Sequence, residues 1–281
     1  MLSKADPGQV EGLSRFFKCA PGQYGQGDKF LGIKVPVTRA VVKDCWRETG
    51  FEQLEECIGS EYHEVRLAAL LTLVEIFGRS KDISRQQCVD FYLSHTERIN
   101  NWDLVDLSCY PLLGQWLLDK DRTLLYELAR SGKTIWEQRI GIVSTMTFIR
   151  HGELDDTFAI ADILLHHRHD LIHKAVGWLL REAGKKDEAA LEAFLKGTAG
   201  SAGDGRCLQA AARHSESDGP GISGQSEGTG RYGESDDAGN TGQSDGSVAP
   251  RYLSMPRTML RYAIEKFPEE RRQQYLRGNA H

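Results

Sequence analysis

The sequence lacks the features that mark secreted, membrane-bound or disulfide-stapled proteins. It contains no CxxC pair, and its cysteines lie in apolar, helix-like segments (Cys19, Cys45, Cys57, Cys88, Cys109 and Cys207). This pattern favours reduced, buried thiols in an intracellular protein over a disulfide framework. The first residues contain no apolar signal-peptide core, and no apolar run approaches the length of a membrane span. We therefore expect a cytoplasmic protein with no membrane segment.

Common catalytic and nucleotide-binding motifs are also missing. There is no GxxxxGK[ST] phosphate loop, no GxSxG nucleophile turn and no set of kinase motifs. His169 and His173 have the i,i+4 spacing of a zinc pair, but no nearby cysteine or glutamate completes a ligand set. The segment around them is typical of a turn between helices. We expect no metal site.

Acidic charge is concentrated in one part of the chain. The formal net charge is −5, and residues 199–250 alone carry eight acids and three bases. The remainder balances 32 acids against 32 bases. A basic binding surface on the folded part must therefore be a local stripe, because the molecule as a whole has no positive field.

Residues 199–250 also differ from the rest in composition. Gly and Ser supply 20 of these 52 residues, and bulky apolar residues are nearly absent. Such a segment cannot bury enough surface to offset its chain entropy, so it is predicted to be a disordered insertion. A phosphate-binding glycine loop is the alternative, but its motif is lacking. A helical pattern resumes after it, so we expect one domain made of residues 1–198 and completed by residues 251–281.

Helical patterns account for the remaining chain. No stretch alternates with period two, so strands are not expected. Apolar spacing, together with Pro and Gly signals at some ends, predicts helices at 36–48, 61–78, 84–94, 101–118, 122–131, 134–150, 154–166, 170–184 and 187–196. The longer ones begin near 61, 101, 134 and 170, a spacing typical of two-helix repeats of roughly 35–45 residues. We predict an all-α, right-handed solenoid of helix pairs, with a globular helical bundle as the alternative.

One segment, "RINNWDLVDLSCYP" (98–111), combines an aromatic ring with an acid. Trp102 and Asp106 are four residues apart, so they share one face of the predicted helix. Each alone is typical of a core aromatic and of a capping or salt-bridging acid. Their shared face indicates a joint role. Asp103 lies about 100° away on the same helix and is expected to matter less.

Cations accompany tryptophans in two further helices. Arg139 follows Trp136 by three residues, and "HKAVGWLLREAGKK" aligns Lys174, Trp178, Arg181 and Lys185 on one face. This pattern suits a phosphodiester backbone, because cations bind phosphates while the ring packs on sugar or base. A solvated basic face is the alternative. In a solenoid, equivalent helices line one concave surface, so we predict a basic stripe of Arg139, Lys174, Arg181, Arg257 and Arg261.

Five segments together resemble one known family. "YGQGDKFLGIKVP", "NNWDLVD", "WEQRIGIV", "KAVGWLLRE" and "MPRTMLRYAIEKFP" are similar, in the same order, to segments of the AlkD-like DNA alkylation repair family of HEAT-like-repeat glycosylases. The resemblance spans nearly the whole chain except residues 199–250. The insertion departs from the family pattern between the last two helical units, away from these segments.

The resemblance implies a role for individual residues. Asp106 matches the family's catalytic carboxylate, and Trp102 and Trp178 match the two aromatics of the lesion site. Arg139 matches an arginine that holds the DNA backbone, and Tyr24 an aromatic at the N-terminal edge. The family implies a monomeric enzyme that excises N3- and N7-alkylated purines from double-stranded DNA, without a metal or organic cofactor.

This chemistry explains why a ring and an acid share a face. An alkylated purine is cationic, so breaking its glycosidic bond releases a neutral base and leaves an oxocarbenium-like sugar. A carboxylate beside that sugar stabilises the developing charge, by roughly 4 kcal/mol at about 4 Å and an effective dielectric near 20. The indoles attract a cation and exclude water. The competing hypothesis is a non-catalytic helical-repeat scaffold that binds DNA or protein through the same face.

Overall fold

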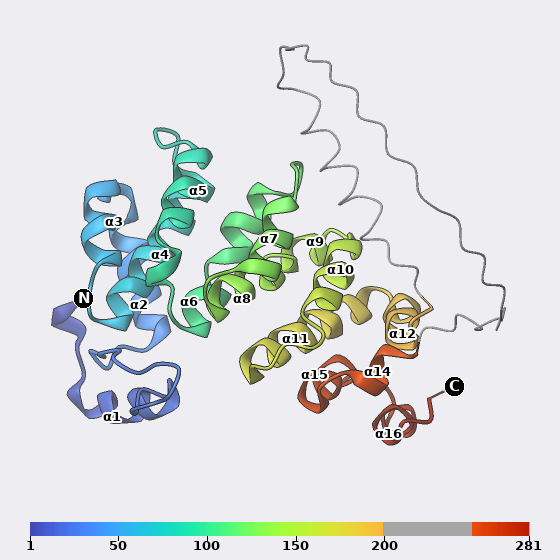
Figure 1. Cartoon of the computed structure of the whole chain (residues 1–281). Coiled ribbons are helices and arrows are strands. Elements are labelled where there is room, and N and C mark those ends of the chain that lie inside the picture. Colours follow the sequence, from blue (N-terminus) through green and yellow to red (C-terminus); the bar gives the residue numbers. More distant parts are fainter. Residues whose placement is uncertain (199–248, 281) are drawn as a thin grey trace, which may run out of the picture.

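The structure is a computed structural model that describes residues 1–198 and 249–280. In this part of the chain the regular elements are helices, and the only strand-like pairing is an isolated bridge between Lys29 and Tyr62. The prediction of an all-helical fold is confirmed (Figure 1). The predicted disorder of 199–250 falls almost wholly outside the described residues.

The N-terminal half contains six α-helices. They are α1 (Pro7–Phe16), α2 (Val35–Cys45), α3 (Phe51–Ile58), α4 (His63–Arg79), α5 (Arg85–Ser94) and α6 (Trp102–Asp106). Short 3-10 turns occupy Leu2–Lys4, Trp46–Glu48 and Thr96–Arg98, and a π turn occupies Tyr110–Gly114.

The C-terminal half continues with shorter helices around one long one. They are α7 (Thr123–Ser131), α8 (Ile135–Val143), α9 (Met146–Arg150), α10 (Asp155–Ile163), α11 (Asp170–Lys186), α12 (Glu188–Lys196), α14 (Arg251–Ser254), α15 (Arg257–Ala263) and α16 (Glu269–Arg277). None of the helices within the described residues is long and apolar enough to cross a membrane.

The helices form two rows along the molecule. Consecutive members of an inner row pack on one another in the order α4, α6, α8, α11 and α15. Helices α3 and α5 pack against α4, α7 against α8, and α10 and α12 against α11. In Figure 1 these pairs follow one another from the N-terminal to the C-terminal end. This arrangement agrees with a helical-repeat solenoid, and its right-handedness stays a prediction.

Capping residues set several helix starts. At the start of α5, the Ser84 hydroxyl accepts a hydrogen bond from the backbone N–H of Gln87, and the Gln87 side chain accepts one from the backbone N–H of Ser84. Thr134 caps α8 through the N–H of Glu137. Helix α4 is covered on most sides by α2, α3, α5 and α6, which explains why its sequence is apolar nearly all round.

Two predicted helices are each broken into two pieces. The segment 101–118 contains α6 and the π turn, because Pro111 has no backbone N–H and the Ser108 hydroxyl donates to the Leu104 carbonyl. The segment 134–150 divides into α8 and α9, where the Thr145 hydroxyl donates to the Ile142 carbonyl. Helices α1 and α3 were not predicted from the apolar spacing.

The cysteines agree only partly with the expectation of burial. The five that the described residues contain are all free. Cys88 and Cys109 are buried, and Cys19 and Cys57 are half-buried. Cys45 is exposed near the end of α2, so burial was the wrong expectation for it.

A glycine fixes the closest approach between inner helices. A methyl group at Gly177 of α11 would lie 2.5 Å from the Met259 carbonyl oxygen and 2.6 Å from Cβ of Tyr262, both on α15. Any side chain there must push α15 away from α11. The packing of the C-terminal helices therefore depends on this position.

We predict that Gly177→Ala destabilises the protein by about 1–3 kcal/mol, because the added methyl overpacks this contact. Gly12→Ala is the matched control: Gly12 is in α1 and a methyl group there would meet nothing within 4 Å. That change should stabilise by up to about 1 kcal/mol through helix propensity. Urea unfolding of the three proteins measures both, and equal stability of Gly177→Ala and wild type would contradict the packing argument.

Candidate active site

Helix α6 positions the aromatic and the acid that share a face. The Asn101 side chain accepts from the backbone N–H of Trp102 and so starts the helix. The Trp102 ring stacks on Phe17 with centroids 5.4 Å apart and meets the edge of Phe16 at 5.7 Å. Trp102 is therefore fixed by the N-terminal segment, while Asp106 lies one turn further along α6.

Asp106 forms a two-point ion pair with Arg139 of α8. Arg139 Nε donates to one carboxylate oxygen at 2.8 Å, and Nη2 donates to the other at 2.7 Å. Arg139 Nη1 also donates to the backbone carbonyl of Leu171 at the start of α11. This fork geometry is the strongest form of carboxylate recognition.

The pKa of Asp106 reflects two opposing influences. Burial is the larger and raises the pKa above its ordinary value, while the charge and hydrogen bonds of Arg139 lower it. Asp103, three residues earlier, adds a like charge that raises the pKa further. The carboxylate thus has a desolvated environment and one dedicated cation, as acids at functional sites often do.

Arg139 of this pair lines a cleft of about 560 Å³. Its lining comes from α1, the following loop, and helices α6, α8, α11 and α15: Arg15, Phe16, Lys18, Tyr24, Trp102, Arg139, Leu171, Lys174, Trp178 and Tyr262. The structure therefore brings together five of the residues singled out in the sequence, namely Tyr24, Trp102, Arg139, Lys174 and Trp178. Asp106 itself does not line the cleft; it is bonded to Arg139, which does, and it keeps 14% of its side chain exposed.

Arg139 does not have the free guanidinium expected of a phosphate ligand. The side chain is buried, and its donors serve Asp106 and the Leu171 carbonyl. The expected division, with the acid facing the sugar and the arginine facing the backbone, stays a prediction, and the structure adds that the two groups are paired with each other. The two groups form one unit, because a buried carboxylate without a cation would be strongly unfavourable.

The other predicted cations are scattered. Arg181 pairs with Glu182 and Glu265, and Arg257 donates to the Leu276 carbonyl at 2.6 Å. Arg261 is exposed on α15. None of these three lines the cleft. The predicted basic stripe is thus not one continuous lining, and the DNA contacts of these residues stay a prediction.

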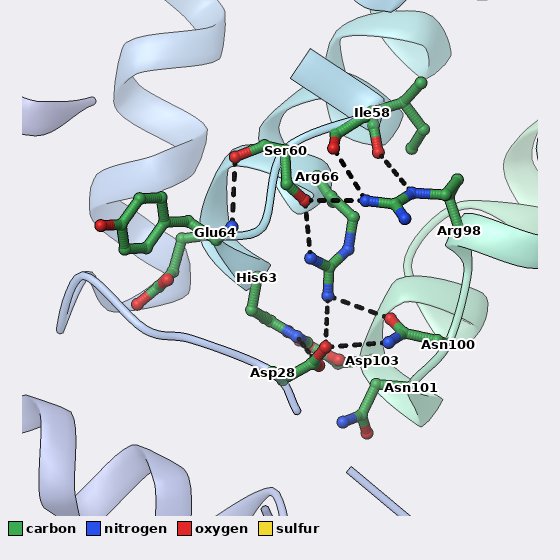
Figure 2. Close-up of polar contacts among 12 residues, drawn as sticks. Asp28, Ile58, Ser60, His63, Glu64, Arg66, Arg98, Asn100, Asn101 and Asp103 are labelled. Carbon is green, nitrogen blue, oxygen red and sulfur yellow. Dashed lines mark hydrogen bonds and ion pairs between the residues drawn. The ribbon is translucent and has the colours of Figure 1, made fainter. Parts of the chain in front are cut away.

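A second buried charge cluster adjoins α6. His63, the first residue of α4, lies between two carboxylates: Nδ1 is 3.1 Å from Asp28 and Nε2 is 2.8 Å from Asp103 (Figure 2). Arg66 donates to Asp28 at 2.7 Å, and Asn100 donates to the same oxygen at 2.8 Å. The cluster joins the N-terminal loop, α4 and α6.

Sequence reasoning missed this cluster and misjudged Asp103. Asp103 is buried and bonded to His63, so it is a structural residue and not a neutral comparison for Asp106. The sequence did contain a signal for the cluster: His63 lies in an apolar helix, and Asp28 and Asp103 lie in the segments "YGQGDKFLGIKVP" and "NNWDLVD". Within the described residues, no group of three or more His, Cys, Asp and Glu residues is placed to hold a metal ion.

The histidines of 166–173 make local contacts. His169 Nδ1 accepts from the backbone N–H of Leu171 and caps α11. His173 Nε2 contacts the carbonyl of His167, and His167 Nε2 contacts the side chain of Gln138. These contacts fix the turn before α11 and give His169 and His173, which have the spacing of a zinc pair, a structural role.

The fold and cleft define a helical-repeat protein whose cleft is lined by two tryptophans and by the arginine of a buried acid–arginine pair. A solved structure, the predicted DNA alkylation repair enzyme from Enterococcus faecalis, has the same fold, with a TM-score of 0.55 and 19% identity over 69% of this chain and 90% of that one. The family model for DNA alkylation repair enzymes matches residues 1–223. The chain belongs to this DNA alkylation repair enzyme family. No curated protein matches it.

The His63 cluster predicts a loss of stability at alkaline pH. Burial opposes the imidazolium charge, but Asp103 and Asp28 outweigh it and raise the pKa of His63 from 6.5 to about 9. A raised folded pKa stabilises fully below the unfolded value, and the effect, about 3 kcal/mol, disappears as the pH rises through about 9. His63→Gln should therefore be less stable at pH 6, and its deficit should shrink towards pH 10 in urea unfolding. A deficit independent of pH would contradict a charged His63.

Proposed function

We propose that the protein is a monofunctional DNA glycosylase that hydrolyses the N-glycosidic bond of cationic N3- and N7-alkylpurines in double-stranded DNA. The main observation behind this proposal is the Asp106–Arg139 pair next to the cleft that Trp102 and Trp178 line. Membership of a DNA alkylation repair family supports this substrate class. Action as a cytoplasmic monomer without cofactor is part of the same proposal.

The reaction balances without an added oxidant or reductant. The bond between C1′ and the purine nitrogen breaks, and its electron pair neutralises the positive charge of the alkylated base. The sugar carries the charge until water adds at C1′ and releases a proton to solvent. The enzyme has only to stabilise the cationic sugar and position the water, which needs a fixed negative group in a dry site.

In this proposal, each residue in or beside the cleft has a separate role. The carboxylate of Asp106 supplies the negative charge, and Arg139 holds both of its oxygens in place. Trp102 and Trp178 offer aromatic faces to the cationic nucleoside and limit water around it. Tyr24 and Lys174 line the same cleft, where Lys174 carries a positive charge paired with Asp170 at 2.7 Å. In this proposal Lys174 binds a phosphate of the same strand.

The second candidate is a non-catalytic scaffold that binds DNA through the same cleft. One observation favours it: both oxygens of Asp106 are occupied by Arg139, so the pair is electrically neutral as it stands. For catalysis, a phosphate of the substrate must interact with the positive charge of Arg139, so that the negative charge of Asp106 can act on the sugar. The two candidates differ in whether removal of the Asp106 charge changes base release.

Asp106→Asn keeps the shape of the side chain and removes its charge. Release of N7-methylguanine from duplex DNA under single-turnover conditions should fall by about 100- to 1,000-fold, since the lost interaction acts on the transition state. Both quantities are corrected for the folded fraction, because the change leaves the buried Arg139 without its carboxylate partner. Binding of the folded protein to undamaged duplex should change little.

Asp156→Asn is the matched control for this experiment. Asp156 is also buried and paired with an arginine, Arg122, at 2.6 Å, and it does not line the cleft. The control should release base at the wild-type rate after correction for folded fraction. Wild-type release by Asp106→Asn would overturn the glycosylase and leave the scaffold.

A further inference from the structure

Helix α1 ends in an unusual way beside the cleft. The backbone N–H of Cys19 donates to the Ser14 carbonyl at 3.0 Å, and that of Lys18 donates to the Arg15 carbonyl at 3.3 Å. These two hydrogen bonds together form a Schellman C-cap, which needs a residue in the left-handed conformation at the position that Lys18 occupies. Lys18 accordingly has a φ of 56°.

Glycine is the usual residue at such a position, because a side chain is unfavourable there. The chain follows the rule elsewhere: Gly197 after α12 and Gly278 after α16 have φ values of 73° and 80°. Among the described residues, Lys18 is the only non-glycine with positive φ. A side chain kept in an unfavourable conformation points to a function for that side chain.

The same turn separates two adjacent phenylalanines. Phe17 is buried and stacks on Trp102 and Phe30. Phe16 lines the cleft, meets the edge of the Trp102 ring, and leaves 59% of its surface uncovered. The stack of Phe17 fixes the backbone, so the orientation of Phe16 towards the cleft is built into the fold.

Positive charge flanks this exposed ring. Lys18 is exposed, lines the cleft, and forms no ion pair with any residue in the described part of the chain. Arg15 also lines the cleft, and its pairing with Glu11 is between exposed side chains, which holds it weakly. Lys174 of α11 and Tyr262 of α15 line the same cleft. An aromatic ring between cations is the arrangement that binds a nucleic-acid strand.

We propose that the end of α1 is a DNA-binding element, in which Phe16 packs against a nucleoside at the edge of the lesion site and Lys18 binds a backbone phosphate. This deepens the proposed function and rests on it for the identity of the ligand. The cleft then takes cations and aromatic rings both from the end of α1 and from α11, which carries Lys174 and Trp178. The strain at Lys18 arises because a residue with a side chain occupies the left-handed position that glycine usually takes.

The test replaces Lys18 by the residue that its backbone favours. Lys18→Gly should raise Tm by about 2–4 °C. It should nevertheless weaken binding to undamaged duplex by about fivefold to tenfold at 0.1 M salt. The slope of the logarithm of the binding constant against the logarithm of salt concentration should fall in magnitude by about 0.9. Lys18→Gln should weaken binding equally without the gain in Tm. Phe16→Ala should weaken binding by about tenfold or more.

Lys81→Gln is the control for a lost positive charge, since Lys81 is exposed in the loop between α4 and α5 and does not line the cleft. It should bind like wild type. Unchanged duplex binding by Lys18→Gly and Phe16→Ala would overturn this inference, even if wild type releases alkylated base. Weakened binding by both variants would support it even if wild type releases no base, in which case only the proposed activity fails.

Discussion

One guanidinium that lines the cleft joins three consecutive inner helices. Arg139 of α8 binds both oxygens of Asp106 on α6 and the carbonyl of Leu171 at the start of α11. Removing either partner of a buried ion pair leaves an uncompensated charge, which costs about 3–5 kcal/mol. The spacing of these helices, and with it the cleft between Trp102 and Trp178, therefore depends on this contact.

A second charged cluster fixes the other side of α6. His63 binds Asp103, while its ring also packs against Phe17 and Phe30, with centroids 4.8 Å away in both cases. Phe17 in turn stacks on Trp102. The short helix α6 is thus fixed from both sides, by His63 through Asp103 and by Arg139 through Asp106. Its five residues could not hold a defined orientation by helix propensity alone.

The local parts of this arrangement could be predicted from the sequence. Apolar periodicity and capping residues depend on neighbours within a turn or two, so most helices were found within a few residues, and the four-residue spacing placed Trp102 and Asp106 on one face. The breaks at Ser108 and Thr145 were missed because side-chain hydroxyls compete with the backbone in a way that periodicity does not record. The pairing of Asp106 with Arg139 joins residues 33 apart, and His63 lies 35 and 40 residues from its two carboxylates. Such contacts depend on how helices pack, which the spacing of residues along one helix does not determine.

The central claim is that the cleft breaks a glycosidic bond, and base release by the wild-type protein tests it most directly. A duplex with one N7-methylguanine is incubated with excess protein and a metal chelator, and the released base and the abasic strand are quantified together. The account predicts equal amounts of free N7-methylguanine and intact abasic DNA, formed faster than the spontaneous loss in buffer. Binding of the duplex with base loss only at the spontaneous rate would contradict it.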